Sequence, residues 1–185
     1  MDTGISSYRR FLEGDDAGLE RIIELYSDGL MLFIYELVRD IHAAEDLMED
    51  AFAELIFRKG QFREDASLKT YLYRTGRNKA LNYLRKNSLI SFFGDNPVKE
   101  ERDETQDIES IVLGRERRRE IFDAVDKLRP DYRQVVYLLY FEEMSYAQAG
   151  KVMSKTEKQI KNLAYRARQS LKEILKKENC DYEEL

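Results

Sequence analysis

Apolar residues in the first ninety positions recur at the three- and four-residue spacing of amphipathic helices. One run comprises Leu19, Ile22, Ile23, Tyr26, Leu30, Phe33, Ile34, Leu37 and Val38. A second run comprises Leu47, Met48, Ala51, Phe52 and Leu55, and it ends at Gly60. The polar segment 61–66 follows, and Ser67 can cap a third helix over about 68–87. With a short N-terminal helix, these elements predict a compact bundle over residues 1–87.

The helical pattern stops at residues 88–107 and resumes near Ile108. Ser, Gly, Asn and Pro begin this interval and charged residues end it, which is typical of a solvated linker. Pro130 stands where a helix can start, and two short helices are predicted at about 145–153 and 157–177. The sequence therefore predicts a second domain over 108–177, followed by an acidic tail at 178–185.

Composition narrows the fold class to all-α. Only 9 Gly and 2 Pro occur in 185 residues, too few for the turns of a β-sandwich. We expect two small helical domains joined by an acidic flexible linker, the second containing a helix-turn-helix. No apolar run approaches the roughly 20 residues of a membrane span, and the N-terminus has no signal-peptide pattern. The expected location is cytoplasmic, without stable membrane association.

The sequence contains few of the cysteine and histidine residues that bind metals or act in catalysis. The single cysteine, Cys180, cannot form an intramolecular disulfide, and the single histidine, His42, excludes two-His metal motifs. His42 with Glu45 and Asp46 has helical spacing that could hold a metal, but one histidine beside surface carboxylates is a weak signal. We predict no catalytic residue, no cofactor and no metal site, and an enzyme is the least supported class.

Charge is segregated along the chain, although the net charge is only −5. Residues 66–94 contain six bases and no acid, and residues 144–172 contain seven bases against Glu157 alone. Residues 36–54 carry seven acids against one arginine, and residues 95–110 carry seven acids against two bases. Two basic segments separated by acidic ones indicate two surfaces that bind a polyanion.

The second basic segment has the pattern of two short helices joined by a tight turn. Ser145 can cap the first helix and Thr156 the second. One side of the second helix is apolar, with Ile160, Leu163, Ala164, Ala167, Leu171 and Ile174. The other side carries Lys158, Lys161, Asn162, Tyr165, Arg168, Gln169 and Lys172. A charged face alone is usually just solvated, but two capped helices at this spacing favour a helix-turn-helix that reads the major groove.

The first basic segment mixes aromatic residues with bases. Arg74, Arg77, Asn78 and Arg85 lie along one ridge of the predicted third helix. Bases follow a phosphate backbone and aromatic rings stack on unpaired bases, so this segment suits single-stranded better than duplex DNA. Tyr71 and Tyr83 can equally be core residues.

In this order, the segments resemble those of bacterial RNA polymerase sigma factors of the extracytoplasmic-function class. DIHAAEDLMEDAF is similar to the acidic helix of sigma region 2, and FREDASLKTYLYRTGRNKALNYLRK to its promoter-melting segment. LRPDYRQVVYLLYFEEMSYAQAG and YRARQSLKEIL resemble region 4. The chain departs from the family in having Tyr71 in place of a usual Trp, and Met153-Ser154-Lys155-Thr156 in a turn that usually contains glycine. Gly150 also stands inside a predicted helix, where glycine is unfavourable.

The resemblance implies three binding surfaces. Residues expected to dock on core RNA polymerase are Asp46, Leu47, Glu49 and Asp50. The loop 61–67 is expected to hold a flipped base of the −10 element, and the opened-strand site comprises Gln61, Phe62, Ser67, Lys69, Tyr71, Arg74, Arg77, Asn78 and Arg85. The duplex −35 element is expected to contact Lys158, Gln159, Lys161, Asn162, Tyr165, Arg166 and Arg168. An anti-sigma factor, common in the family, is a possible further partner.

Two other functions remain open on the sequence alone. A helix-turn-helix regulator acting without polymerase would leave residues 36–86 unexplained. A sigma mimic that binds an anti-sigma factor would not need bases on its DNA-facing surfaces. Because the chain is acidic overall, we expect the free protein to bind promoter DNA weakly.

Overall fold

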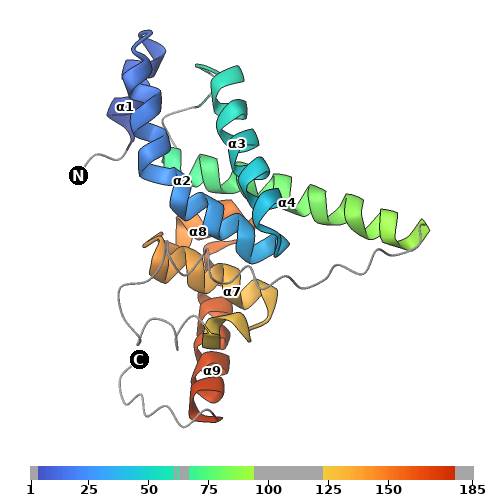
Figure 1. Ribbon diagram of the computed structural model, residues 1–185. Helices are drawn as coiled ribbons and strands as arrows, with labels where there is room; N and C mark the ends of the chain where they lie inside the picture. Colours follow the sequence, from blue (N-terminus) through green and yellow to red (C-terminus); the bar gives the residue numbers. More distant parts are fainter. Residues whose placement is uncertain (1–3, 61, 63–66, 94–122, 178–185) are drawn as a thin grey trace. The chain divides into compact units, whose positions relative to one another are not determined.

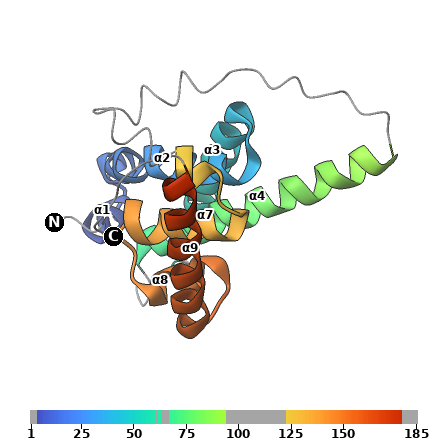
Figure 2. The same cartoon turned by 90° about the horizontal axis from the view of Figure 1, so that it is seen from below.

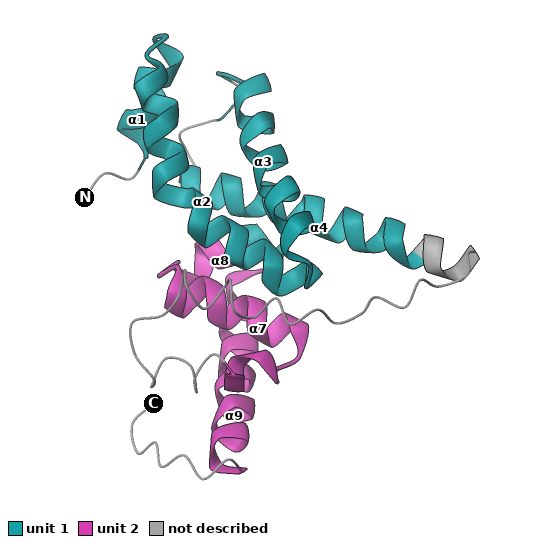
Figure 3. Ribbon diagram, in the orientation of Figure 1, with its two compact units in different colours: residues 1–100, 151–154 teal, residues 101–150, 155–185 magenta. Residues whose placement is uncertain are grey.

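The computed structural model describes residues 4–60, 62, 67–93 and 123–177, and these residues are helical or lie in turns between helices (Figure 1). Two compact units are present (Figure 3). The first comprises residues 1–100 with 151–154, and the second comprises 101–150 with 155–185. In the described part of the chain, no helix is both long enough and apolar enough to cross a membrane.

Four helices build the first unit: α1 (Ile5–Leu12), α2 (Asp16–Val38), α3 (Ile41–Phe57) and α4 (Leu68–Phe93) (Figures 1 and 2). Helix α2 packs against the other three, and α3 also packs on α4. Fully buried apolar side chains fill the space between them: Ile22, Leu30, Phe33, Ile34, Ala44, Ala51, Leu55, Leu72, Tyr73 and Ala80. The predicted bundle is thus confirmed as an all-helical unit.

The helix starts follow from capping side chains that the sequence predicts in part. The backbone N–H of Ala43 donates to Asp40 Oδ1 over 3.0 Å at the start of α3. At the start of α4, the N–H of Thr70 donates to the hydroxyl of Ser67 over 3.1 Å, which confirms the predicted cap. Helix α4 continues to Phe93 and does not end near residue 87, so the predicted linker begins too early. The rest of that linker lies outside the described residues.

Helix α4 approaches α2 closely at Gly76. A Cβ at this position would lie 2.9 Å from Ile34 Cδ1 and 3.0 Å from Leu30 Cδ1. A larger residue would require the ends of these two side chains to shift. The basic ridge of α4 is therefore carried on a helix that is held firmly against the core.

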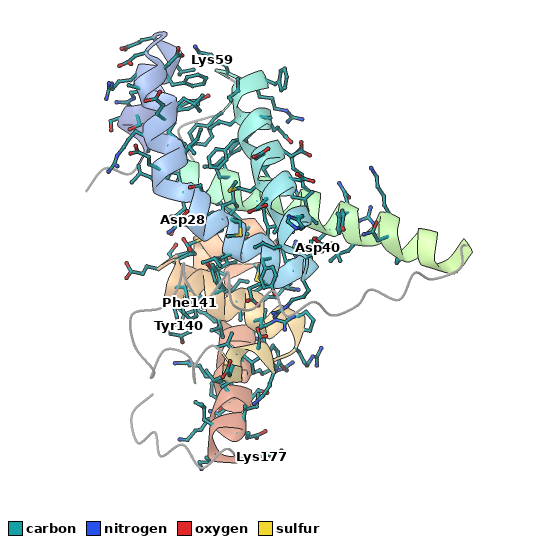
Figure 4. All side chains as sticks on the ribbon, viewed as in Figure 1. Asp28, Asp40, Lys59, Tyr140, Phe141 and Lys177 are labelled. Carbon is teal, nitrogen blue, oxygen red and sulfur yellow. The ribbon has the colours of Figure 1, made fainter. Side chains whose placement is uncertain are left out.

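The second unit contains α7 (Pro130–Val136), a π-helical turn η1 (Tyr137–Phe141), residues 146–150 of α8 (Tyr146–Met153) and α9 (Glu157–Lys177). Pro130 occupies the first turn of α7, as predicted, and α7 packs on α9. In η1 the N–H of Glu142 donates to the carbonyl of Tyr137, which widens the turn. Tyr140 and Phe141 remain partly exposed (Figure 4).

Candidate nucleic-acid interface

The helix-turn-helix segment has a reciprocal cap at the start of both of its helices. At α8 the N–H of Ser145 donates to Gln148 Oε1 over 2.9 Å, and the N–H of Gln148 donates to the hydroxyl of Ser145 over 3.2 Å. At α9 the N–H of Thr156 donates to Gln159 Oε1 over 2.8 Å, and the N–H of Gln159 donates to Thr156 Oγ1 over 3.2 Å. Both predicted caps are confirmed as capping boxes. The side-chain carbonyl oxygen of Gln159 serves the cap, and its amide nitrogen takes no part in it.

The turn between α8 and α9 keeps a conformation that suits glycine at Ser154 and requires glycine at position 150. Ser154 adopts the left-handed conformation, with φ 55°, that glycine would take most easily. The N–H of Lys155 donates to the carbonyl of Gly150 over 2.9 Å. A Cβ on Gly150 would lie only 2.6 Å from the backbone oxygen of Lys155, so the close approach requires glycine at position 150.

The predicted two faces of α9 are present in the structure. Ile160, Ala164, Ala167 and Leu171 are buried, and so is Leu175, whereas Leu163 and Ile174 are only half-buried. The basic and hydrogen-bonding side chains are exposed on the opposite face: Lys158, Gln159, Lys161, Asn162, Tyr165, Arg166, Arg168, Gln169 and Lys172. Tyr165 exposes 59% of its surface although it is large and aromatic. Helix α9 thus offers a continuous polar face over several turns.

One carboxylate interrupts this basic face. Glu157, the first residue of α9, lies 2.7 Å from Lys161 through Oε1 and Nζ, and both side chains are about half exposed. The hydrogen bond from Lys161 and the charge of Glu157 raise the pKa of the Lys161 ammonium. The same Nζ lies 5.6 Å from the ring centroid of Tyr146 in α8. Lys161 is therefore fixed between a carboxylate and an aromatic ring.

The basic ridge of α4 is only partly exposed. Arg74, Asn78 and Arg85 face solvent, whereas Arg77 and Lys69 are half-buried. Burial lowers the pKa of the Arg77 guanidinium from its usual value. The Nζ of Lys69 lies 5.8 Å from the ring centroid of the buried Tyr73. Arg74, Asn78 and Arg85 are thus the members of the predicted strand site that lie most openly on the surface.

An aromatic cluster anchors the segment between α3 and α4. Phe62 is 9% exposed, and its ring lies 5.3 Å from that of Tyr8 and 5.4 Å from that of Tyr71, edge to face in both cases. The hydroxyl of Tyr8 accepts a hydrogen bond from the N–H of Gly60 over 3.1 Å. Burial is the main cause that raises the pKa of the half-buried Tyr71, followed by the charge of Glu54. Phe62 and Tyr71, both predicted DNA contacts, therefore also pack the unit.

Two further members of the predicted strand site are Ser67 and Gln61. The hydroxyl of Ser67 caps α4 and lies 2.9 Å from that of Thr70, so it has a structural task. Gln61 lies outside the described residues, as do residues 63–66 of the predicted base-holding loop. Sequence reasoning missed Tyr8, whose only local signal is its helical spacing to Phe11.

The acidic face of α3 contains the predicted polymerase-binding residues. Asp46, Glu49 and Asp50 are exposed and Leu47 is half-buried between them. Lys79 of α4 lies 3.7 Å from Asp50 and 3.4 Å from Glu54, measured from Nζ to the nearest carboxylate oxygen. Asp50 is thus paired across the helix interface, which distinguishes it from Asp46 and Glu49.

His42 lies on the surface, near one of the two carboxylates that share its helical spacing. It is 83% exposed and its Nδ1 lies 3.7 Å from a carboxylate oxygen of Glu45. In the ranges that the structure describes, no group of three His, Cys, Asp or Glu side chains could hold a metal ion. Cys180 lies outside those ranges.

Two family models match the chain. The model of sigma-70 region 2 matches residues 22–90, and the model of sigma-70 region 4 matches residues 118–171. Between them they cover most of the chain, in the same order as the two predicted DNA-binding segments.

Curated relatives match over nearly the whole length. The ECF RNA polymerase sigma factor SigM of Bacillus subtilis is 24% identical over 84% of this chain and 94% of its own. SigW of the same organism, also an ECF RNA polymerase sigma factor, is 24% identical over 89% of this chain and 92% of its own. The solved structure of the sigma factor RpoE from Bartonella quintana, in complex with the anti-sigma factor NepR, has a similar fold. Its TM-score is 0.65 at 23% identity, over 85% of this chain and 96% of that one.

Proposed function

This chain belongs to the extracytoplasmic-function family of RNA polymerase sigma factors, and from that premise we propose how its surfaces divide the work of transcription initiation. A sigma factor binds core RNA polymerase and promoter DNA and gives the polymerase its promoter specificity. The domain that ends with α4 at Phe93 binds polymerase and opens the −10 element. The acidic segment that follows, up to residue 107, is the linker, 108–177 is the domain that binds the −35 element, and 178–185 is an acidic tail.

The exposed basic face of α9 is the observation that carries the proposal for duplex DNA. Lys158, Lys161 and Asn162 lie in its first two turns, where a recognition helix contacts base edges. Tyr165, Arg166 and Arg168 follow and hold the phosphates on either side. Gln159 closes the cap of α9 and contributes its amide nitrogen.

The opened −10 strand lies along α4. Arg74, Asn78 and Arg85 contact its phosphates and bases because they are the exposed members of the ridge. Lys69 and Arg77 add positive charge from the sides, and Tyr71 offers one edge of its ring. Phe62 and Ser67 shape the loop that receives the flipped base, together with Gln61. Extruding a base costs a few kcal/mol, which these contacts offset.

The exposed carboxylates of α3 dock on the polymerase. Asp46 and Glu49 contribute most, because Asp50 is already paired with Lys79. Leu47 adds an apolar contact at the centre of this face. The chain itself makes and breaks no bond, since the polymerase performs the chemistry, and it acts in the cytoplasm where the polymerase is. By analogy with the solved sigma factor bound to NepR, an anti-sigma factor is a further partner.

Reconstitution with bacterial core RNA polymerase tests these assignments. We expect the protein to co-elute with core polymerase and to direct run-off transcription from a promoter upstream of its own gene. The double variant Asp46→Asn with Glu49→Gln should have at least tenfold lower affinity for core polymerase. Its thermal stability should be unchanged. The matched control is Glu20→Gln with Glu24→Gln, which removes two exposed carboxylates from α2.

Three results would contradict the proposal. Absence of co-elution by a folded protein would contradict the polymerase-binding role. Specific promoter binding by the free protein, at physiological salt, would instead favour a regulator that acts alone. Binding of an anti-sigma factor without polymerase or DNA binding would favour a sigma mimic.

A further inference from the structure

Glu157 is unexpected on a DNA-binding face, although an acid in the first turn also stabilises the helix. It is the single acid among the eight charged residues of segment 144–172, and it opens the helix whose first turns face the bases. A carboxylate near phosphates is unfavourable unless it accepts hydrogen bonds from a partner. In the free protein that partner is Lys161, one turn further along α9.

The geometry of this ion pair matches the major-groove edge of one base pair. In a G·C pair, guanine presents the acceptors O6 and N7, and cytosine presents the donor N4. O6 and N4 bond to each other, so they lie about 2.9 Å apart. Glu157 Oε1 and Lys161 Nζ are separated by 2.7 Å and have the opposite, complementary polarity.

We propose that Glu157 and Lys161 together read one G·C pair of the −35 element, which makes Glu157 a specificity-determining residue. The ammonium of Lys161 donates to guanine O6 or N7, and the carboxylate of Glu157 accepts from cytosine N4. This inference rests on the proposed function of α9 as the −35 recognition helix. It adds to that function the identity of a base pair and a role for the acid in the first turn of α9.

The surroundings of Lys161 hold the pair ready for this contact. Tyr146 of α8 lies beneath the ammonium, and the pair is half exposed, so DNA can reach both groups without rearranging the helix. Away from a G·C pair, Glu157 neutralises Lys161 and repels phosphate. The pair therefore lowers affinity for every sequence except one that satisfies both groups.

A selection experiment with the reconstituted holoenzyme tests the proposal. A promoter fragment with randomised −35 bases is bound at physiological salt, and bound sequences are counted for the wild type and for three variants. We expect the wild type to enrich one G·C pair at a fixed position. Glu157→Ala should reduce the preference for cytosine at that position about tenfold and leave the other positions unchanged. Glu157→Gln should shift the preference towards adenine, because glutamine pairs with adenine N6 and N7.

Glu173→Ala is the matched control, since it removes an exposed acid from the far end of the same helix. It should leave every base preference as in the wild type. If Glu157→Ala alters all positions equally, or gives the same profile as Glu173→Ala, Glu157 acts only through charge and the proposal is wrong. If the wild-type holoenzyme selects no −35 sequence at all, the fault lies with the proposed function of α9. Circular dichroism of both Glu157 variants verifies that the cap by Thr156 and Gln159 is kept.

Discussion

The backbone oxygen of Lys155 lies where any side chain on Gly150 would begin, 2.6 Å from the position of a Cβ. Gly150→Ala should therefore force the turn of the helix-turn-helix to open. Overpacking of this kind costs about 1–3 kcal/mol. Urea unfolding monitored by circular dichroism should show the loss, and promoter binding by the holoenzyme should fall. A variant as stable as the wild type would mean that the turn relaxes easily.

In the same turn, a substitution at Ser154 should stabilise the protein. Its φ of 55° is unfavourable for a residue with a Cβ by about 1–2 kcal/mol, and glycine removes that cost. Glycine also loses more backbone entropy on folding, so we expect Ser154→Gly to stabilise the protein by about 1 kcal/mol. Thermal unfolding measures this difference. Ser154→Ala, which keeps the Cβ, should give no such gain.

We expect the ring of Phe62 to stabilise the first unit by packing, in addition to its proposed contact with DNA. Phe62→Ala removes a ring held between Tyr8 and Tyr71, and such truncations cost about 3–5 kcal/mol when the site is buried. Phe62→Leu keeps much of the volume and should cost less than half as much. Chemical denaturation of both variants tests this order. Equal stabilities would show that the cluster contributes little to the unit.

The half-buried Tyr71 should make the first unit sensitive to alkaline pH. Its pKa is raised above 10.0 in the folded state, chiefly by burial, so the folded protein favours the neutral phenol. The resulting stabilisation is fully present below pH 10 and is lost as the pH rises through the folded-state pKa. Unfolding free energies measured between pH 8 and pH 11 should fall less steeply for Tyr71→Phe than for the wild type. Parallel pH profiles would contradict the assignment to Tyr71.

Local signals in the sequence were sufficient for the helices and their faces. Ser67, Ser145 and Thr156 cap helices where their residue types predict it, and Ile160 and Ala164 lie on the buried side of α9. These features depend on contacts within a few residues. Helical periodicity and the residue types at helix starts are therefore enough to predict these caps and buried faces.

Contacts between distant residues were not predictable in the same way. Tyr8, Phe62 and Tyr71 meet only after α1, the loop and α4 have come together. The resemblance therefore predicted Phe62 and Tyr71 as DNA contacts, and nothing in the sequence singled out Tyr8. The need for Gly150 comes from the turn that follows it, which periodicity cannot reveal. Helical spacing likewise gives no sign of the π-helical turn at Tyr137–Phe141.

The aromatic cluster has a practical consequence for work with shortened proteins. Helix α1 looks peripheral and carries none of the predicted contacts, so it is a natural candidate for removal when a minimal promoter-melting fragment is designed. Yet Tyr8 supports Phe62 with its ring and Gly60 with its hydroxyl. A fragment that starts at α2 would lose both contacts, and a loss of activity would then reflect the lost packing of Phe62 as much as a missing DNA contact.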